Sequence, residues 1–226
     1  RYQEVTGVQT CALPILLVPL ALTLEPAMTP KPAPPQTTAE PTGTNDFRLG
    51  VSPALLLTAA FIGLVMYVGP VFAPFYVSEI GVTDPRLAAL PMSAMSIGAL
   101  IMASNYGRLH GRFGTTPLFF LTMALAGIGL VGAGLAGSLP VFIAAMFTVA
   151  CGLALFTPNL GTYITSTSQR PARGIGWAMS AIFAVQILFP FIAQAIEAAL
   201  GPAAVFLLLG GMALGASGAF AIKGLR

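Results

Sequence analysis

The sequence has few charged residues, and this scarcity restricts its class. Only 8% of its 226 residues are Asp, Glu, Lys or Arg, whereas 56% are hydrophobic, and the mean hydropathy is +0.87. Soluble domains carry roughly 25% charged residues, so this chain has too few polar groups to cover a soluble surface. We therefore expect an all-α integral membrane protein whose outer surface contacts the lipid bilayer.

Cysteine and histidine are also scarce, and their scarcity argues against most kinds of catalytic or metal site. The two cysteines, Cys11 and Cys151, provide neither a disulfide framework nor the spacing of a metal site. The sequence contains no HExxH motif, no paired metal carboxylates and no phosphate-binding Gly-Lys loop. We therefore predict no enzyme activity, no metal and no cofactor. The net charge of +3 comes from single basic residues at helix ends, which predicts no nucleic-acid partner.

Titratable residues are absent from the middles of all the long apolar segments. Glu79 and Glu197 lie near segment ends, and no Asp, Lys or Arg lies deeper. Proton-coupled transport needs a titratable group buried in the pathway, so this chain supplies no obvious coupling residue.

The first 49 residues differ in composition from the rest. Residues 5–15, VTGVQTCALPI, resemble the translated reverse complement of a widely used sequencing-library adapter, so we interpret residues 1–15 as an artefact. Residues 16–24 are apolar but fall short of the about 20 residues that span a bilayer, and we interpret them as the stub of a truncated helix. Residues 25–49 contain six prolines, which predicts a disordered cytoplasmic linker.

Residues 50–226 contain six apolar segments, which we predict to be six transmembrane helices. Each is long enough to cross a hydrocarbon core of about 30 Å at about 1.5 Å per residue. Prolines inside three of them predict kinks that neighbouring helices can satisfy. The expected helices are Val51–Ile80, Pro85–Ser104, Pro117–Gly137, Leu139–Thr165, Arg173–Leu200 and Pro202–Ile222.

A basic segment, residues 105–116, separates the second and third helices and predicts the topology. Its glycines favour a tight turn, because glycine adopts positive φ angles readily. If residues 25–49 are cytoplasmic and the helices alternate, eight Lys and Arg side chains fall on the cytoplasmic side and only Arg86 falls outside, leaving Arg1 aside. This bias follows the positive-inside rule. We therefore place residues 25–49 and 105–116 in the cytoplasm of a protein of the plasma or inner cell membrane.

The basic segment resembles the signature loop of the major facilitator transporters, roughly G-x-x-x-D-[RK]-x-G-[RK]. Gly107, Arg112 and Gly114 match, whereas Gly111 replaces the aspartate and Thr115 replaces the second basic residue. The order of segments, six helices after a proline-rich linker, is similar to the C-terminal half of such a transporter. The resemblance covers about residues 16–226. It implies half of a major facilitator bundle, packed as two three-helix units related by inverted repeats.

The resemblance also implies a function and partners. It implies secondary active transport of a small-molecule substrate by alternating access, with efflux as the expected direction and a missing N-terminal six-helix half as partner. Gly107, Arg108, Arg112 and Gly114 are then expected at a cytoplasmic gate, where Arg112 and Gly114 matter more than Arg108. Without the aspartate, we expect Arg112 to use helix C-terminal carbonyls or lipid phosphate. The alternative is a non-transporting membrane scaffold.

The fifth predicted helix carries a polar stripe that we interpret as part of a substrate cavity. Gln186, Pro190, Gln194 and Glu197 are spaced so that they share one side of a helix. A glutamine facing lipid is unfavourable, so Gln186 and Gln194 are expected to point into the bundle or a wet cavity. The alternative is hydrogen bonding between helices.

Further cavity candidates lie on the first and fourth predicted helices. Asn159 and Tyr163 belong to a looser polar stripe on the fourth helix, and Tyr67 precedes the prolines of the first. Tyr76 either lines the same cavity or anchors the helix at the membrane interface.

The last apolar segment carries two glycine motifs. Gly211 and Gly215 form a GxxxG motif, for which we favour close packing within the chain. Residues 215–218, GASG, look like the GxSG of rhomboid-type intramembrane proteases. That chemistry needs a histidine on a later helix to activate Ser217, and the only histidine, His110, comes earlier. The protease interpretation is therefore the weakest of the three functions.

Overall fold

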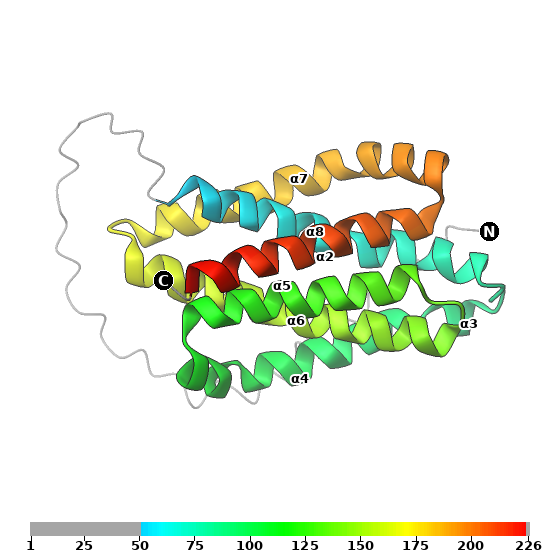
Figure 1. Cartoon of the computed structure of the whole chain (residues 1–226), viewed down its shortest axis with the longest axis horizontal. Helices are drawn as coiled ribbons and strands as arrows, with labels where there is room; N and C mark the ends of the chain where they lie inside the picture. Colours follow the sequence, from blue (N-terminus) through cyan, green and yellow to red (C-terminus); the bar gives the residue numbers. More distant parts are fainter. Residues whose placement is uncertain (1–50, 225–226) are drawn as a thin grey trace, which may run out of the picture. The chain divides into compact units, whose positions relative to one another are not determined.

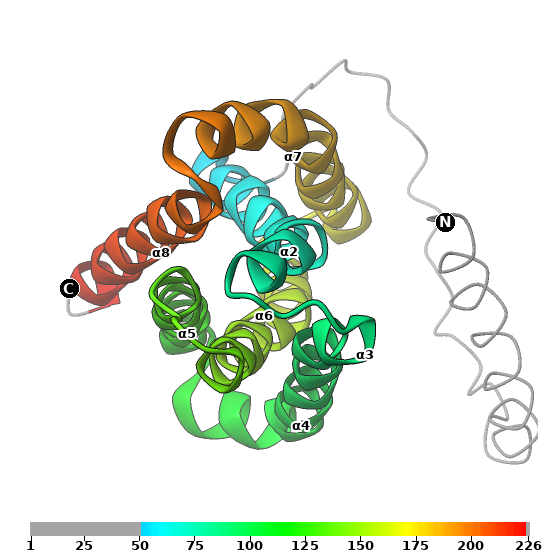
Figure 2. The same cartoon turned by 90° about the vertical axis from the view of Figure 1, so that its right-hand side faces the viewer.

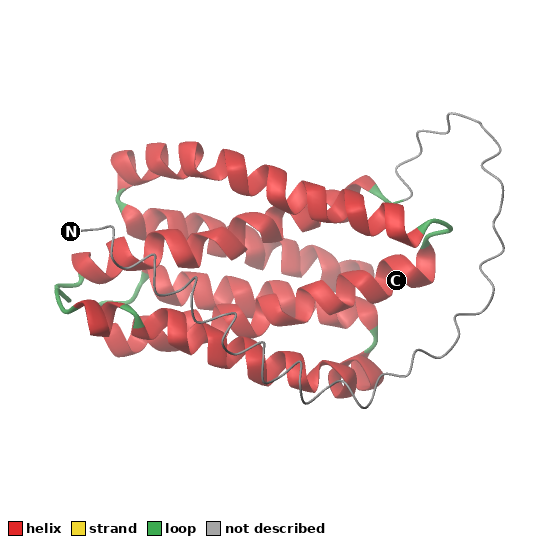
Figure 3. Ribbon diagram, turned by 180° about the vertical axis from the view of Figure 1, so that it is seen from behind, coloured by secondary structure: helices red, strands yellow, loops and turns green. Residues whose placement is uncertain are grey.

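The computed structural model describes residues 51–224, with side chains to residue 218, and this part of the chain is helical throughout apart from short turns (Figures 1 and 3). The regions assigned above to residues 1–15, 16–24 and 25–49 lie outside the described residues. The helices are α2 (Pro53–Glu79), α3 (Pro85–Ala88), α4 (Leu90–Phe113), α5 (Thr115–Gly134), α6 (Leu139–Thr167), α7 (Pro171–Leu200) and α8 (Pro202–Gly224).

The described helices confirm an all-α architecture of the multi-pass membrane kind. Five segments are long and apolar enough to cross a bilayer, and one of them, Pro85–Phe113, combines α3 and α4. The sixth, α8, is apolar over Pro202–Gly218 and stays helical to Gly224. All six predicted segments are thus helices, with bounds that differ from the predicted ones mainly after Ser104.

Local sequence explains where the helices start and stop. Ser52 caps α2, because its Oγ accepts a hydrogen bond from the N–H of Leu55 at 3.3 Å. Proline occupies one of the first positions of most of the described helices, where its missing N–H costs nothing. The chain reverses at Gly81, Gly114 and Gly201, which adopt φ angles of 83°, 77° and 80°, as glycine does at low cost.

The predicted turn over the basic segment is wrong in extent. α4 continues through this segment to Phe113, so Gly107 and Gly111 are helical and only Gly114 makes the turn. Helical glycine costs only about 1 kcal/mol. Side chains support the extension, since Asn105 Nδ2 donates to the carbonyl of Ile101 at 2.8 Å. The helix therefore does not end where the apolar run ends.

Most of the extensive helix contacts join a helix of one predicted three-helix unit, α2–α5, to a helix of the other, α6–α8. The main contacts join α2 to α7, α4 to α6, and α5 to both α6 and α8. Figure 2 shows the result end-on: α4 and α7 lie at opposite ends, with α2 and α6 between them. The first helix of each unit thus packs on the second helix of the other unit.

Two apolar clusters fill the core, and Tyr76 belongs to one of them. Its ring stacks on Phe142 with centroids 4.9 Å apart and meets Phe206 edge-on at 5.5 Å. Its hydroxyl shares its proton between the carbonyls of Gly134 and Ala136, at 3.2 and 3.0 Å. Tyr76 is therefore neither cavity lining nor an interfacial anchor, because it ties α2 to the end of α5.

Glycines set the distance between some helices but not all. A Cβ at Gly129 would lie 2.6 Å from the backbone nitrogen of Val149, so α5 and α6 approach as closely as this glycine allows. The GxxxG motif of α8 behaves differently. Gly211 and Gly215 are exposed, and a Cβ on either would meet nothing within 4 Å. The expectation that this motif packs within the chain is wrong for the described residues, because α8 turns Gly210 toward α5 instead.

Candidate functional site

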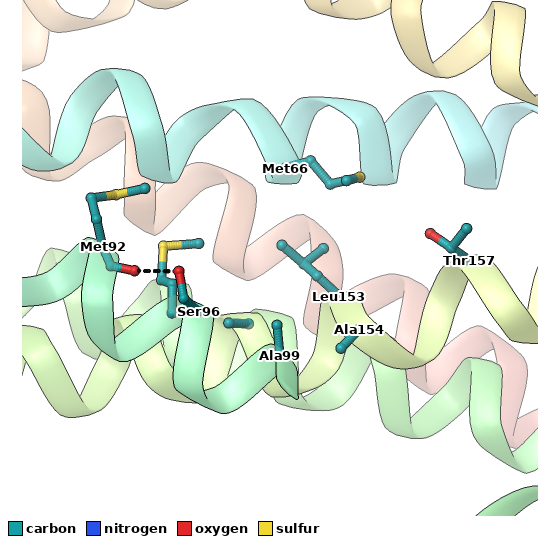
Figure 4. Close-up of a pocket in the computed structure, with 9 residues that line it drawn as sticks. Met66, Met92, Ser96, Ala99, Leu153, Ala154 and Thr157 are labelled. Atoms are coloured by element: carbon teal, nitrogen blue, oxygen red, sulfur yellow. Dashed lines mark hydrogen bonds between the residues drawn. The ribbon is translucent and has the colours of Figure 1, made fainter. Parts of the chain in front are cut away.

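An open groove of about 360 Å³ lies between α2, α4 and α6 (Figure 4). α2 and α4 belong to the first three-helix unit and α6 to the second, so the groove lies where the two units meet. Its described lining residues are Met66, Met92, Met95, Ser96, Ala99, Ala150, Leu153, Ala154 and Thr157.

The groove lies at the middle of the candidate membrane spans. Met66 is the central residue of Pro53–Glu79, Ala99 of Pro85–Phe113, and Leu153 of Leu139–Thr167. Three separate helices therefore place their midpoints around one hollow.

Three methionines give the groove most of its chemical character. Met92 and Met95 are three residues apart and so share a face of α4, while Met66 projects from α2 on the other side (Figure 4). Met66 is 38% exposed, so its thioether is accessible. Gly69 lets α4 approach α2 here, because a Cβ at this position would lie 2.9 Å from the methyl carbon of Met95.

The polar groups of the groove are few and partly occupied. Ser96 donates its hydroxyl proton to the carbonyl of Met92 at 3.1 Å, within its own helix (Figure 4). Thr157 is exposed and adds one hydroxyl. None of the described lining residues is Asp, Glu, His, Lys or Arg. This surface can bind a molecule by contact, but it offers no side chain that ionises.

The predicted polar stripe of α7 lies away from this groove. The buried residues of α7 are Gly174, Ala178, Ile182, Phe189 and Ala193. Gln186 is half-buried and Gln194 is exposed, so the stripe lies beside the buried face rather than on it. Within the described bundle, no other helix covers Gln194, so a role of Gln186 and Gln194 in lining a cavity stays a prediction.

Tyr67 also lies outside the groove. Its half-buried ring meets Phe189 of α7 edge-on, with centroids 6.2 Å apart. It is next to Met66 in sequence but projects from a different side of α2, since successive helix residues are about 100° apart. Tyr67 thus contributes to the packing of α2 on α7.

The two candidates on α6 contact α5 instead of the groove. Asn159 is fully buried, and its Nδ2 donates to the carbonyl of Thr115 at 2.9 Å while its Oδ1 has no hydrogen-bond partner. Tyr163 meets Phe119 edge-on with centroids 5.9 Å apart. Asn159 is therefore an interhelical hydrogen-bonding residue, the alternative considered above for the stripe of α7.

The predicted gate residues lie together at the end of α4. Gly107, Arg108 and Arg112 are exposed there, and Gly114 makes the turn into α5. Arg108 Nη1 donates to Asn105 Oδ1 at 3.3 Å. The guanidinium carbon of Arg112 lies 5.5 Å from the centre of the Phe113 ring, which is within the range of a cation–π contact.

The only histidine takes part in a polar network at this end of the bundle. His110 Nε2 lies 3.2 Å from Thr115 Oγ1, and its ring faces that of Tyr106 at 5.5 Å. The Tyr106 hydroxyl in turn lies 3.1 Å from Thr162 Oγ1 on α6. Ser217 of α8 also bonds α5, because its hydroxyl donates to the carbonyl of Phe120 at 3.5 Å. The contacts of Ser217 and His110 are thus structural hydrogen bonds to α5.

Sequence reasoning missed all nine lining residues because it searched for polar side chains. The available signal was the pair Met92 and Met95, a Met-x-x-Met spacing in a chain with nine methionines. Nothing in the sequence indicates that Met66 lies opposite this pair.

Known proteins add no assignment to this geometry. The chain matches no protein-family model, and no curated protein sequence matches it.

Proposed function

We propose that residues 50–226 are the C-terminal six-helix half of a major facilitator transporter, which moves a small molecule across the membrane by alternating access, with export as the direction. The observation that carries the proposal is the packing of each three-helix unit across the other. The sequence contributes the order of six helices and the partial signature segment at the end of α4.

Most of the extensive helix contacts follow the pattern expected of an inverted repeat, and this supports the proposal. If the two units are exchanged, α2 replaces α6, α4 replaces α7 and α5 replaces α8. This exchange turns the contact of α2 with α7 into the contact of α6 with α4, and it leaves the contact of α5 with α8 unchanged. All three contacts are among the main ones. One pair departs from the symmetry, since α5 packs extensively on α6 but α8 only slightly on α2. Repeats of this kind are common in secondary transporters.

The exposed helices support a further bundle as partner. Only 11% of the apolar window of Pro85–Phe113 and 17% of that of α7 is buried within the described bundle, compared with 44% for α2 and 50% for α6. The groove opens between α2, α4 and α6, midway along the candidate spans, and transporters bind substrate near the bilayer midplane. We propose that an N-terminal half covers this side and that the substrate binds between the two halves.

The test compares substrate flux into two kinds of proteoliposome. One contains the chain alone, and the other contains the proposed intact transporter with both six-helix halves, here called the parent protein. A pair of variants on α6 makes the test specific. Ala154 lines the groove and Ala144 is exposed elsewhere on the same helix. In the parent, Ala154→Phe should block most of the groove and reduce saturable flux at least about tenfold, because misplacing a substrate slightly has large effects. Ala144→Phe should leave flux unchanged. Saturable flux from the chain alone, or equal effects of the two variants, would contradict the proposal.

A further inference from the structure

We propose that the groove between α2, α4 and α6 binds an uncharged, largely apolar molecule with aromatic rings, recognised by thioether and methyl contacts instead of ion pairs or a hydrogen-bond network. This inference rests on the proposed function, because it names the substrate class of the same site. The resemblance to the major facilitator transporters leaves this substrate class open.

The described lining residues offer few hydrogen-bond partners to a polar ligand. A sugar or amino acid would bring several hydroxyl, ammonium or carboxylate groups into the groove. Ser96 already donates to Met92, which leaves the hydroxyl of Thr157 as the main free donor. Buried polar groups without partners weaken binding strongly. A polar substrate is therefore a poor fit to this half of the site.

The three methionines give the groove contacts that suit an aromatic ligand. Thioether side chains are flexible and polarisable, and sulfur makes favourable contacts with aromatic rings at about 5 Å. Met66 faces the groove from α2 and Met92 faces it from α4 (Figure 4), and Met95 of α4 also lines it. Methionine-rich surfaces can adapt to molecules of different shapes. A ring system placed between these helices would have a sulfur within reach on both sides.

The shape and size of the groove suit a small, flat molecule. Ala99, Ala150 and Ala154 supply small methyl groups from α4 and α6, which leave room for a flat molecule between the longer methionine side chains. The volume of about 360 Å³ falls within the range of about 300–1,000 Å³ typical of small-molecule sites. This half of the site alone is large enough to contact most of a small aromatic compound.

The test is photolabelling of the full chain in lipid nanodiscs with a neutral aryl diazirine, followed by mass spectrometry of the labelled peptides. A naphthalene derivative, glucose and glycine serve as competitors. We expect saturable labelling of the Met66 and Met92–Met95 peptides that the naphthalene derivative displaces and that glucose and glycine do not. Met66→Gln should raise the half-saturating concentration about tenfold, since an amide is placed in an apolar contact. Met66→Leu should raise it by a smaller factor, about threefold, since leucine keeps the apolar contact and removes only the contact of sulfur with the ring.

Met212→Gln provides the matched control, because Met212 is an exposed methionine on α8 outside the groove. It should leave groove labelling unchanged. Equal, non-saturable labelling at Met212 and Met66 would show partition into lipid only and would overturn the inference. Displacement by glucose or glycine would overturn the substrate class without touching the transport proposal. Saturable aromatic labelling of the chain, combined with no flux by the parent protein, would support the binding inference and reject the transport proposal.

Discussion

A close contact between two helices predicts a large cost for one added methyl group. Gly129 on α5 packs directly on the backbone of α6. A Cβ there would lie 2.6 Å from both the nitrogen and Cγ2 of Val149, and 2.8 Å from the carbonyl oxygen of Ala145. Carbon contacts are normally about 3.5–4.0 Å, so Gly129→Ala must push α5 and α6 about 1 Å apart. Backbone atoms cannot rotate away, and we expect a loss of about 2 kcal/mol in the free energy of unfolding.

Gly152 provides an internal check because it makes the reciprocal contact. A Cβ at Gly152 on α6 would lie 2.7 Å from the carbonyl oxygen of Thr122 and 2.8 Å from the nitrogen of Ala126, both on α5. Gly152→Ala should therefore cost about as much as Gly129→Ala. The double variant should cost less than the sum, since one separation of the two helices relieves both clashes.

The assay is unfolding of the full chain in mixed micelles by added SDS, followed by far-UV circular dichroism. Gly211→Ala is the matched control, because Gly211 is helical and exposed and a Cβ there would meet nothing within 4 Å. It should leave the unfolding free energy unchanged or raise it by up to about 1 kcal/mol, since alanine favours the helix more than glycine does. If Gly129→Ala is no more destabilising than Gly211→Ala, the packing of α5 on α6 described above is incorrect.

Three further variants test other contacts. Tyr76→Phe should cost about 1 kcal/mol in the same unfolding assay, because it removes the hydroxyl that bonds the end of α5; a cost near zero would mean that this bond contributes nothing. Gly114→Ala should cost about 1 kcal/mol or more, since φ is 77° there, whereas Gly107→Ala, in open helical space, should be neutral or stabilising. In the intact parent protein, Arg112→Ala should slow transport more than Arg108→Ala while both insert normally, as measured by flux and by the amount of protein in the membrane; unchanged flux in Arg112→Ala rejects a gating role.

The sequence predicted the helices well because hydrophobicity alone determines most of them. Val51–Ile80 was predicted and Pro53–Glu79 is observed, with differences that reflect capping by Ser52. The basic segment was predicted less well, since polar residues carry α4 beyond the apolar run to Phe113. Helix extension outside the hydrocarbon depends on local bonds such as that of Asn105 to Ile101, which hydropathy does not report.

The groove was not predictable because its residues are ordinary in sequence. A methionine in a membrane helix is as apolar as its neighbours, so Met66 carries no signal until α2 is placed beside α4. Polar residues were the natural search criterion, yet Asn159 uses its polarity to bind Thr115 of α5. Which helices are neighbours in space is the missing information, and single-helix periodicity does not contain it.

The packing of α2 on α7 determines the order in which this bundle can form. A ribosome delivers α2 to the membrane long before it delivers α7, because residues 80–170 must be synthesised between them. α2 has only slight contacts with α4 and α6, so the helices synthesised soon after it cover only part of its buried face. Domains rich in such distant contacts fold slowly and expose unsatisfied surfaces meanwhile. α2 thus waits in the bilayer with the face that later packs on α7 uncovered, and newly made chains that stop before Pro171 should be substrates for membrane quality control.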